Sequence, residues 1–155
     1  MPPIFPFSVI LRGGRLLGLA AALALGVTGP ACAERGPRPL VLADGSAAAH
    51  QGEVTARIAA FQAARGRQVR VIRAERPAEA VLLASRGDVD VALVEASHPI
   101  DDFVAAEHGR EAGTLVIEAQ PSSTTLRVLE VNAVAHPKVD AEGARSLAAA
   151  LVSPP

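Results

Sequence analysis

Short apolar runs alternate along the chain with segments in which apolar residues recur three or four positions apart. The runs suit buried strands, and the wider spacing is typical of helices that are apolar on one side. Strands and helices that alternate in this way, with short connections, predict an α/β domain. We expect a parallel-rich sheet with helices on both faces. The expected strands are 40–43, 68–72, 91–94, 114–118 and 126–131, and the expected helices are 52–65, 78–86, 99–108 and 141–152.

Individual residues mark where these helices begin and end. Gly66 suits the position just after the first helix, where the backbone often turns left-handed. Pro77 suits the first turn of the second helix. Asp140 can accept a hydrogen bond at the start of the last helix.

The first 33 residues have the pattern of a secretory signal peptide. Arg12 and Arg15 precede a short apolar stretch, 16–27, which is followed by Ala31-Cys32-Ala33. We predict cleavage between Ala33 and Glu34, a linker at 34–39, a single domain at 40–155 and a periplasmic or secreted location. The alternative is a lipoprotein signal cut before Cys32, which the preceding residues fit poorly. The apolar stretch is shorter than the ~20 residues of a membrane span, so none is expected in the mature chain.

Composition excludes several classes of protein. Half of the 155 residues are hydrophobic, 3% are aromatic, and the net charge is −1. A disordered chain would be more polar, and a nucleic-acid-binding domain would carry a basic face, so no nucleic acid is expected as a partner. The single Cys excludes a disulfide framework and a zinc site built from several cysteines.

The loop after the first predicted strand is the best candidate for a ligand site. Ligands of such sheets bind beyond the carboxyl ends of the strands. Ser46 supplies a hydroxyl, the N–H groups from Ala47 onward open a helix, and Arg76 follows the neighbouring strand. We predict an oxyanion site made by Ser46, Ala47 and Arg76. The alternative is an ordinary turn, in which Asp44 repels anions and Arg76 pairs with Asp44 or faces solvent.

Other chemistry-bearing residues form no recognisable catalytic or metal-binding pattern. Asp88 and Asp90 alternate like a catalytic pair, but they precede a strand, which is the wrong end for catalysis, so a structural role is expected. No G-x-S-x-G pattern surrounds Ser46. We therefore expect no enzyme, no metal and no cofactor. The four histidines show no metal-binding spacing, and surface or turn roles are expected for them: His50, which lies nearest the candidate loop, His98, His108 and His136.

Several longer phrases carry a family resemblance. Their sequences are ADGSAA with a glycine at position 52, AFQAARGRQVRVI, RGDVDVALV, FVAAEHG, VNAVAHPKV with AEGAR, and LVSP. Together these phrases resemble the periplasmic substrate-binding proteins of tungstate-type ABC transporters. The resemblance implies one lobe of a type II periplasmic-binding-protein fold, a tungstate, molybdate or similar oxyanion as ligand, and an ABC permease as partner.

The chain departs from that family in three places. The second lobe is missing at about 119–126, where only Gln120 to Thr125 (QPSSTT) separates the flanking strands. The hydroxyl-rich loop keeps only Ser46, and Glu75-Arg76-Pro77 stands where the family has a glycine-rich loop. One lobe leaves an anion half hydrated, so the expected function is weak or altered anion binding by a solute-binding-like protein. The alternative is an interaction or dimerisation module without a small-molecule ligand.

Overall fold

The computed structural model describes residues 37–118 and 123–153. The predicted signal peptide, the cleavage point and residues 119–122, which are part of the place predicted for the missing lobe, lie outside these residues. In the described part of the chain, no helix is long and apolar enough to cross a membrane.

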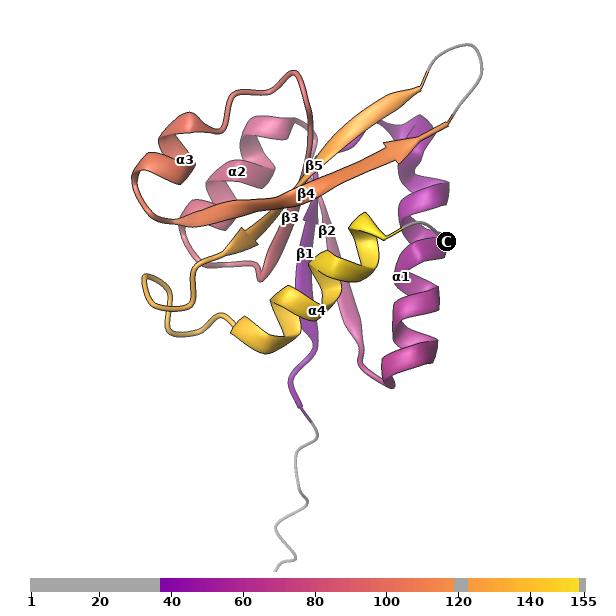
Figure 1. Cartoon of the computed structure of the whole chain (residues 1–155), viewed down its shortest axis with the longest axis horizontal. Helices are drawn as coiled ribbons and strands as arrows, with labels where there is room; N and C mark the ends of the chain where they lie inside the picture. The colour runs from indigo at the N-terminus through magenta and orange to yellow at the C-terminus, as the bar shows by residue number, and fades with distance from the viewer. Residues whose placement is uncertain (1–36, 119–122, 154–155) are drawn as a thin grey trace, which may run out of the picture. The chain divides into compact units, whose positions relative to one another are not determined.

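The sheet is mixed, with five strands in the order β2-β1-β3-β5-β4 (Figure 1). β1 pairs in parallel with β2 and β3, whereas β5 is antiparallel to both β3 and β4. The expectation of an α/β fold is confirmed, but the sheet is less parallel than predicted. The strands are β1 (Leu40–Asp44), β2 (Val69–Arg73), β3 (Val91–Glu95), β4 (Gly109–Ile117) and β5 (Thr124–Val131).

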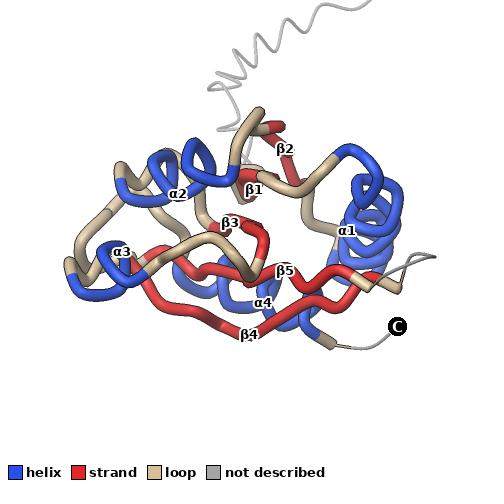
Figure 2. The backbone as a smooth tube through the Cα atoms, turned by 90° about the horizontal axis from the view of Figure 1, so that it is seen from above, coloured by secondary structure: helices blue, strands red, loops and turns tan. Residues whose placement is uncertain are grey.

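Helices cover both faces of the sheet, as predicted. The chain moves from β1 outward to β2 and then back across to β3, and right-handed crossovers in opposite directions place their helices on opposite faces. α2 packs on β1 and β3, whereas α4 packs on β4 and β5 beside α1. Figure 1 shows α4 in front of the strands, and Figure 2 shows the same arrangement from above. The helices are a short 3-10 turn η1 (Ala48–His50), α1 (Gln51–Arg65), α2 (Pro77–Ser85), α3 (Asp101–Ala105) and α4 (Ala141–Val152).

Most of the predicted helix ends are confirmed. Val54, Ile58 and Phe61 are buried on α1, and Gly66 ends that helix with a φ of 62°. Pro77 opens α2. The third helix was predicted at 99–108, but α3 spans only Asp101–Ala105.

The largest difference from the sequence prediction concerns β4. It begins at Gly109 rather than at residue 114, and it is an edge strand with a bulge between Glu111 and Gly113. A Cβ at Gly109 would lie 2.3 Å from the carbonyl oxygen of Glu130, so this part of the strand approaches its neighbour too closely for any side chain.

Asp90 joins the sheet to the segments around it. Its side chain is 1% exposed. Its carboxylate accepts hydrogen bonds from the N–H of Val41 at 2.8 Å and of Asp140 at 2.9 Å, and it pairs with the guanidinium of Arg38. Its backbone N–H donates to Val41, and its carbonyl accepts from Val131. One residue therefore connects the segment before β1, β1 itself, β5 and the start of α4, which confirms a structural role for Asp90.

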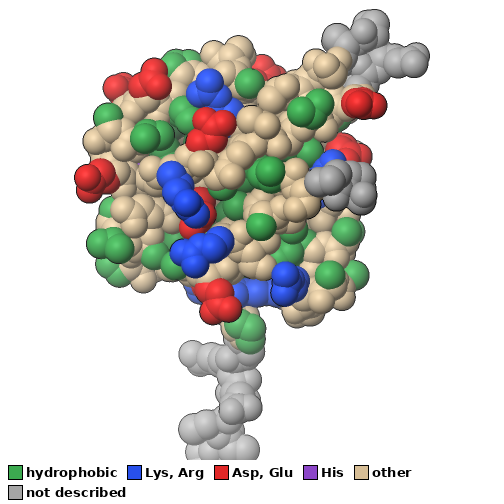
Figure 3. Space-filling model, viewed as in Figure 1, with side chains coloured by type: hydrophobic (Ala, Val, Ile, Leu, Met, Phe, Trp, Pro, Cys, Tyr) green, Lys and Arg blue, Asp and Glu red, His purple; other side chains and the backbone are tan. Residues whose placement is uncertain are grey.

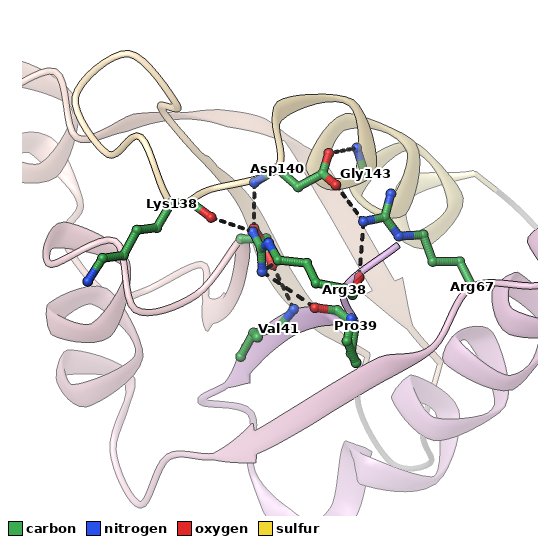
Figure 4. Close-up of polar contacts among 8 residues, drawn as sticks. Arg38, Pro39, Val41, Arg67, Lys138, Asp140 and Gly143 are labelled. Carbon is green, nitrogen blue, oxygen red and sulfur yellow. Dashed lines mark hydrogen bonds and ion pairs between the residues drawn. The ribbon is translucent and has the colours of Figure 1, made fainter. Parts of the chain in front are cut away.

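The start of α4 is fixed by a second carboxylate. Asp140 accepts a hydrogen bond from the N–H of Gly143 at 2.8 Å, as predicted for a capping residue, and pairs with Arg67 (Figure 4). Arg67 also donates to the carbonyl of Arg38, and Arg38 donates to the carbonyl of Lys138 at 2.7 Å. The hydrogen bond from Gly143, followed by the contact with Arg67, lowers the pKa of Asp140 below the ordinary value of 3.8.

We predict that Asp90→Ala destabilises the domain strongly. The substitution leaves the backbone N–H groups of Val41 and Asp140 without acceptors. A buried N–H group without an acceptor lowers stability by about 1–3 kcal/mol. The free energy of unfolding, measured by urea denaturation, should fall by about 3 kcal/mol or more. Asp88→Ala is the matched control, because Asp88 is exposed; it should change stability by less than about 0.5 kcal/mol. Equal losses in the two variants would contradict the account.

Asp140→Asn should make stability less dependent on pH. The folded-state pKa is lowered, so the ionised carboxylate stabilises the fold above pH 3.8 and this contribution is lost as the pH falls further. The variant should be less stable than wild type by about 1 kcal/mol at neutral pH. The difference should shrink below pH 3.8. Denaturant melts over that range measure it, and a difference that stays constant with pH would contradict a role for the charge.

Candidate functional site

The candidate loop lies at the carboxyl end of β1, against the start of α2. The N–H of Gly45 donates to the carbonyl of Leu93 at 2.9 Å. A Cβ at Gly45 would lie 3.1 Å from the Cα of Pro77, so a side chain there would require the two segments to move apart by a few tenths of an ångström. The loop that contains Ser46 therefore lies next to the N-terminus of α2, where Arg76 is the N-cap residue.

Asp44 carries a compensated charge. It is 1% exposed, and its Oδ1 accepts the N–H of Ser46 at 3.0 Å. Its Oδ2 forms an ion pair with Arg73, whose guanidinium also donates to the hydroxyl of Thr55 at 3.2 Å. Arg73, rather than Arg76, is therefore the ion-pair partner of Asp44. Arg76 itself is exposed at the N-cap of α2.

Besides the Oδ2 of Asp44, whose only partner is the ion pair with Arg73, two buried polar atoms in this loop have no hydrogen-bond partner among the described residues. They are the Oγ of Ser46, in a residue 6% exposed, and the Nδ1 of His50, in a residue 8% exposed. A buried polar atom without a partner costs about 1–3 kcal/mol, so such atoms are rare, and a water or a ligand can supply the missing partner. Ser46 was a predicted site residue; His50 was only the histidine nearest to it.

The helix ends at this edge have no side-chain caps. The N-cap residues of η1, α1 and α2 are Ala47, His50 and Arg76, and none of their side chains caps its helix. Ala47 is exposed and offers only its backbone. The start of α2 is the poorer donor, because Pro77 has no N–H. In addition, the carboxylate of Glu79 lies there and accepts the N–H of Glu75 at 2.9 Å.

Two histidines that are far apart in the sequence come together elsewhere. The Nδ1 of His108 and the Nε2 of His136 are 3.3 Å apart, and both rings are half-buried. Both residues lie in turns, as expected, but nothing in the sequence indicated that their rings are in contact. His108 precedes β4 and His136 follows β5, and these strands are neighbours. Only the pairing of β4 with β5 could have revealed their proximity.

A groove of about 650 Å³ lies at the opposite edge of the sheet. It contains Glu130, which pairs across the sheet with Val91 at the start of β3. Arg110 donates to Glu130 at 2.7 Å, and Arg145 lies 3.9 Å from its other oxygen. Figure 3, on the face with β4 and α4, shows Lys and Arg side chains next to Asp and Glu. Mixed charge of this kind does not favour an anion, so the groove is the weaker candidate.

Comparison with known proteins gives a fold but no family. No family model and no curated protein matches the chain. A solved structure of a conserved, functionally unknown protein from Vibrio parahaemolyticus is similar, with a TM-score of 0.61 and 14% sequence identity. The match covers 76% of this chain and 95% of that chain. The two proteins thus share an α/β fold.

Proposed function

We propose that this protein is an exported, solute-binding-like domain that binds a small oxyanion weakly at the loop between β1 and α1. The observation that carries the proposal is the pair of buried atoms without partners, the Oγ of Ser46 and the Nδ1 of His50. Both can donate a hydrogen bond. An oxyanion brings the acceptors that these two atoms lack.

The charges around the loop favour the binding of an anion more than the sequence alone suggested. Asp44 argued against an anion, but its charge is balanced by Arg73. Arg76 then contributes a further positive charge beside the start of α2. The N–H groups that open η1 and α1, from Ala47 onward, add a positive electrostatic potential.

Weak affinity follows from the missing lobe. The chain leaves the sheet along β4 and returns along β5, and only residues 118–123 connect the two strands. A two-lobe binding protein would insert its second lobe at such a point and close it over the ligand. A single lobe leaves the anion partly hydrated, so we expect millimolar affinity. A role in oxyanion uptake with an ABC permease is part of this proposal.

A second candidate function is self-association, and one surface favours it. β4 is an edge strand with unpaired backbone groups, and Val116 on it is 52% exposed. Val104 and Val134, near the other end of β4, are 44% and 90% exposed and line the groove described above. A second copy could pair with this edge.

A thermal melt with millimolar tungstate, molybdate, phosphate or sulfate tests the anion site. An anion at ~10 times its dissociation constant raises the free energy of unfolding by about 1.4 kcal/mol, which is a shift of several degrees in Tm. Ser46→Ala and Arg76→Ala should each reduce the shift. Arg65→Ala is the matched control, because Arg65 is exposed at the far end of α1.

The control also separates binding from the general stabilisation that sulfate and phosphate give to most proteins. An equal shift of Tm in the wild type and in Ser46→Ala, Arg76→Ala and Arg65→Ala would contradict the proposed site. No shift with any anion would favour the second function.

The second function predicts a concentration-dependent dimer. Light scattering should then give twice the mass of one chain, and Val116→Lys should restore the monomer, because charge on an edge strand opposes pairing. A monomer at all concentrations would remove this candidate.

A further inference from the structure

We infer that His108 and His136 form a two-histidine binding site for a divalent transition metal such as Zn²⁺ or Ni²⁺. The inference is independent of the proposed anion site, which lies in a different loop. Neutral imidazole nitrogens are preferred ligands of these ions. The two rings come from the turn before β4 and from the connection between β5 and α4.

The distance between the two nitrogens suits a shared metal. They are 3.3 Å apart, and with metal–nitrogen bonds of ~2.05 Å this gives a ligand–metal–ligand angle of roughly 107°. That angle is close to tetrahedral, the geometry that zinc prefers. The ring centroids are 5.4 Å apart, so the nitrogens face each other, and modest ring rotations would aim both lone pairs at one ion.

The backbone around the pair is held in place. The side chain of Asn132 donates to the carbonyl of Glu107 at 3.0 Å, and the N–H of Asn132 donates to the carbonyl of His108 at 2.8 Å. The carbonyl of Asn132 in turn accepts the N–H of His136 at 2.9 Å. One residue therefore connects both histidine segments, so little ordering is needed when a metal binds.

Two local features support a built site. Glu107, directly before His108, has a φ of 58° because it closes α3 in a left-handed helix end, where the N–H of His108 donates to the carbonyl of Phe103 and so fixes the position of His108. His136 packs against Gly87, where a Cβ would lie 2.6 Å from the Cβ of His136. Any side chain at position 87 would displace the ring.

Binding would leave coordination positions for water. Within 37–118 and 123–153, no third His, Cys, Asp or Glu joins the pair. The site is therefore weaker than a four-ligand structural zinc site and open to solvent. Without metal, one ring donates its N–H to the other. Metal binding requires that ring to move its proton to its outer nitrogen, with no net release of protons when both rings are neutral.

Calorimetric titration of the metal-free protein with Zn²⁺ or Ni²⁺, in a non-coordinating buffer, tests the inference. We expect one ion per chain and at least a tenfold loss of affinity in His136→Ala. His98→Ala is the matched control, because His98 is also half-buried but lies in the loop after β3; it should bind like wild type. No binding, or unchanged affinity in His136→Ala, would overturn the site.

A second measurement avoids the risk that the variant misfolds. The imidazole ¹⁵N spectrum of the wild-type protein should show Zn²⁺ shifting the Nδ1 of His108 and the Nε2 of His136, while both nitrogens of His98 stay in place. Shifts at other histidines alone, or none, would contradict the inference.

Discussion

The buried carboxylate of Asp90 is the interaction on which the rest of the domain depends. The sheet has parallel and antiparallel parts, and Asp90 lies just before β3, where the two parts meet. Its backbone and side chain bind groups of β1, β5 and the start of α4, and Arg38 balances its charge. A buried carboxylate is stable only when its oxygens are satisfied in this way. The charge pair of Asp140 and Arg67 extends the network to α4.

This network and the candidate ligand loop lie at opposite ends of the parallel strands. The amino ends, around Asp90, hold a network of paired polar groups, in which the Nε of Arg67 is the one buried atom without a hydrogen-bond partner among the described residues. At the carboxyl end of β1, Asp44 is paired as well, but Ser46 and His50 retain buried atoms without partners. The network at the amino ends stabilises the fold, and the carboxyl end of β1 is the second edge, at which we propose that a ligand binds. Ligands of open α/β sheets bind at this second edge.

The sequence predicted local structure well, because local structure depends on local residues. The apolar stripe of α1, the left-handed Gly66 and the cap at Asp140 each follow from a few neighbouring side chains. The antiparallel β5 was missed, although one signal was present. Two predicted strands, 114–118 and 126–131, had no helix between them, and strands joined so closely pair antiparallel, because a parallel pair needs a longer crossover.

The candidate site was only partly predictable for a similar reason. Its position followed from the order of strand and loop, which the sequence displays. The ion-pair partner of Asp44 could not be predicted. From the sequence alone, Arg73 and Arg76 are equally plausible partners until the direction of each side chain is known. The pairing of His108 with His136 depends on two strands that are neighbours in space, so no spacing within the sequence could reveal it.

The central claim is that an oxyanion binds where Ser46 and His50 are buried. Backbone amide NMR during a titration with tungstate or phosphate tests it most directly, because it reports the position of the ligand as well as its affinity. The account predicts that the largest shifts fall on the amides of residues 45–50 and at the start of α2, with saturation in the millimolar range. Shifts centred instead on Arg110 and Arg145, or an unchanged spectrum, would contradict it.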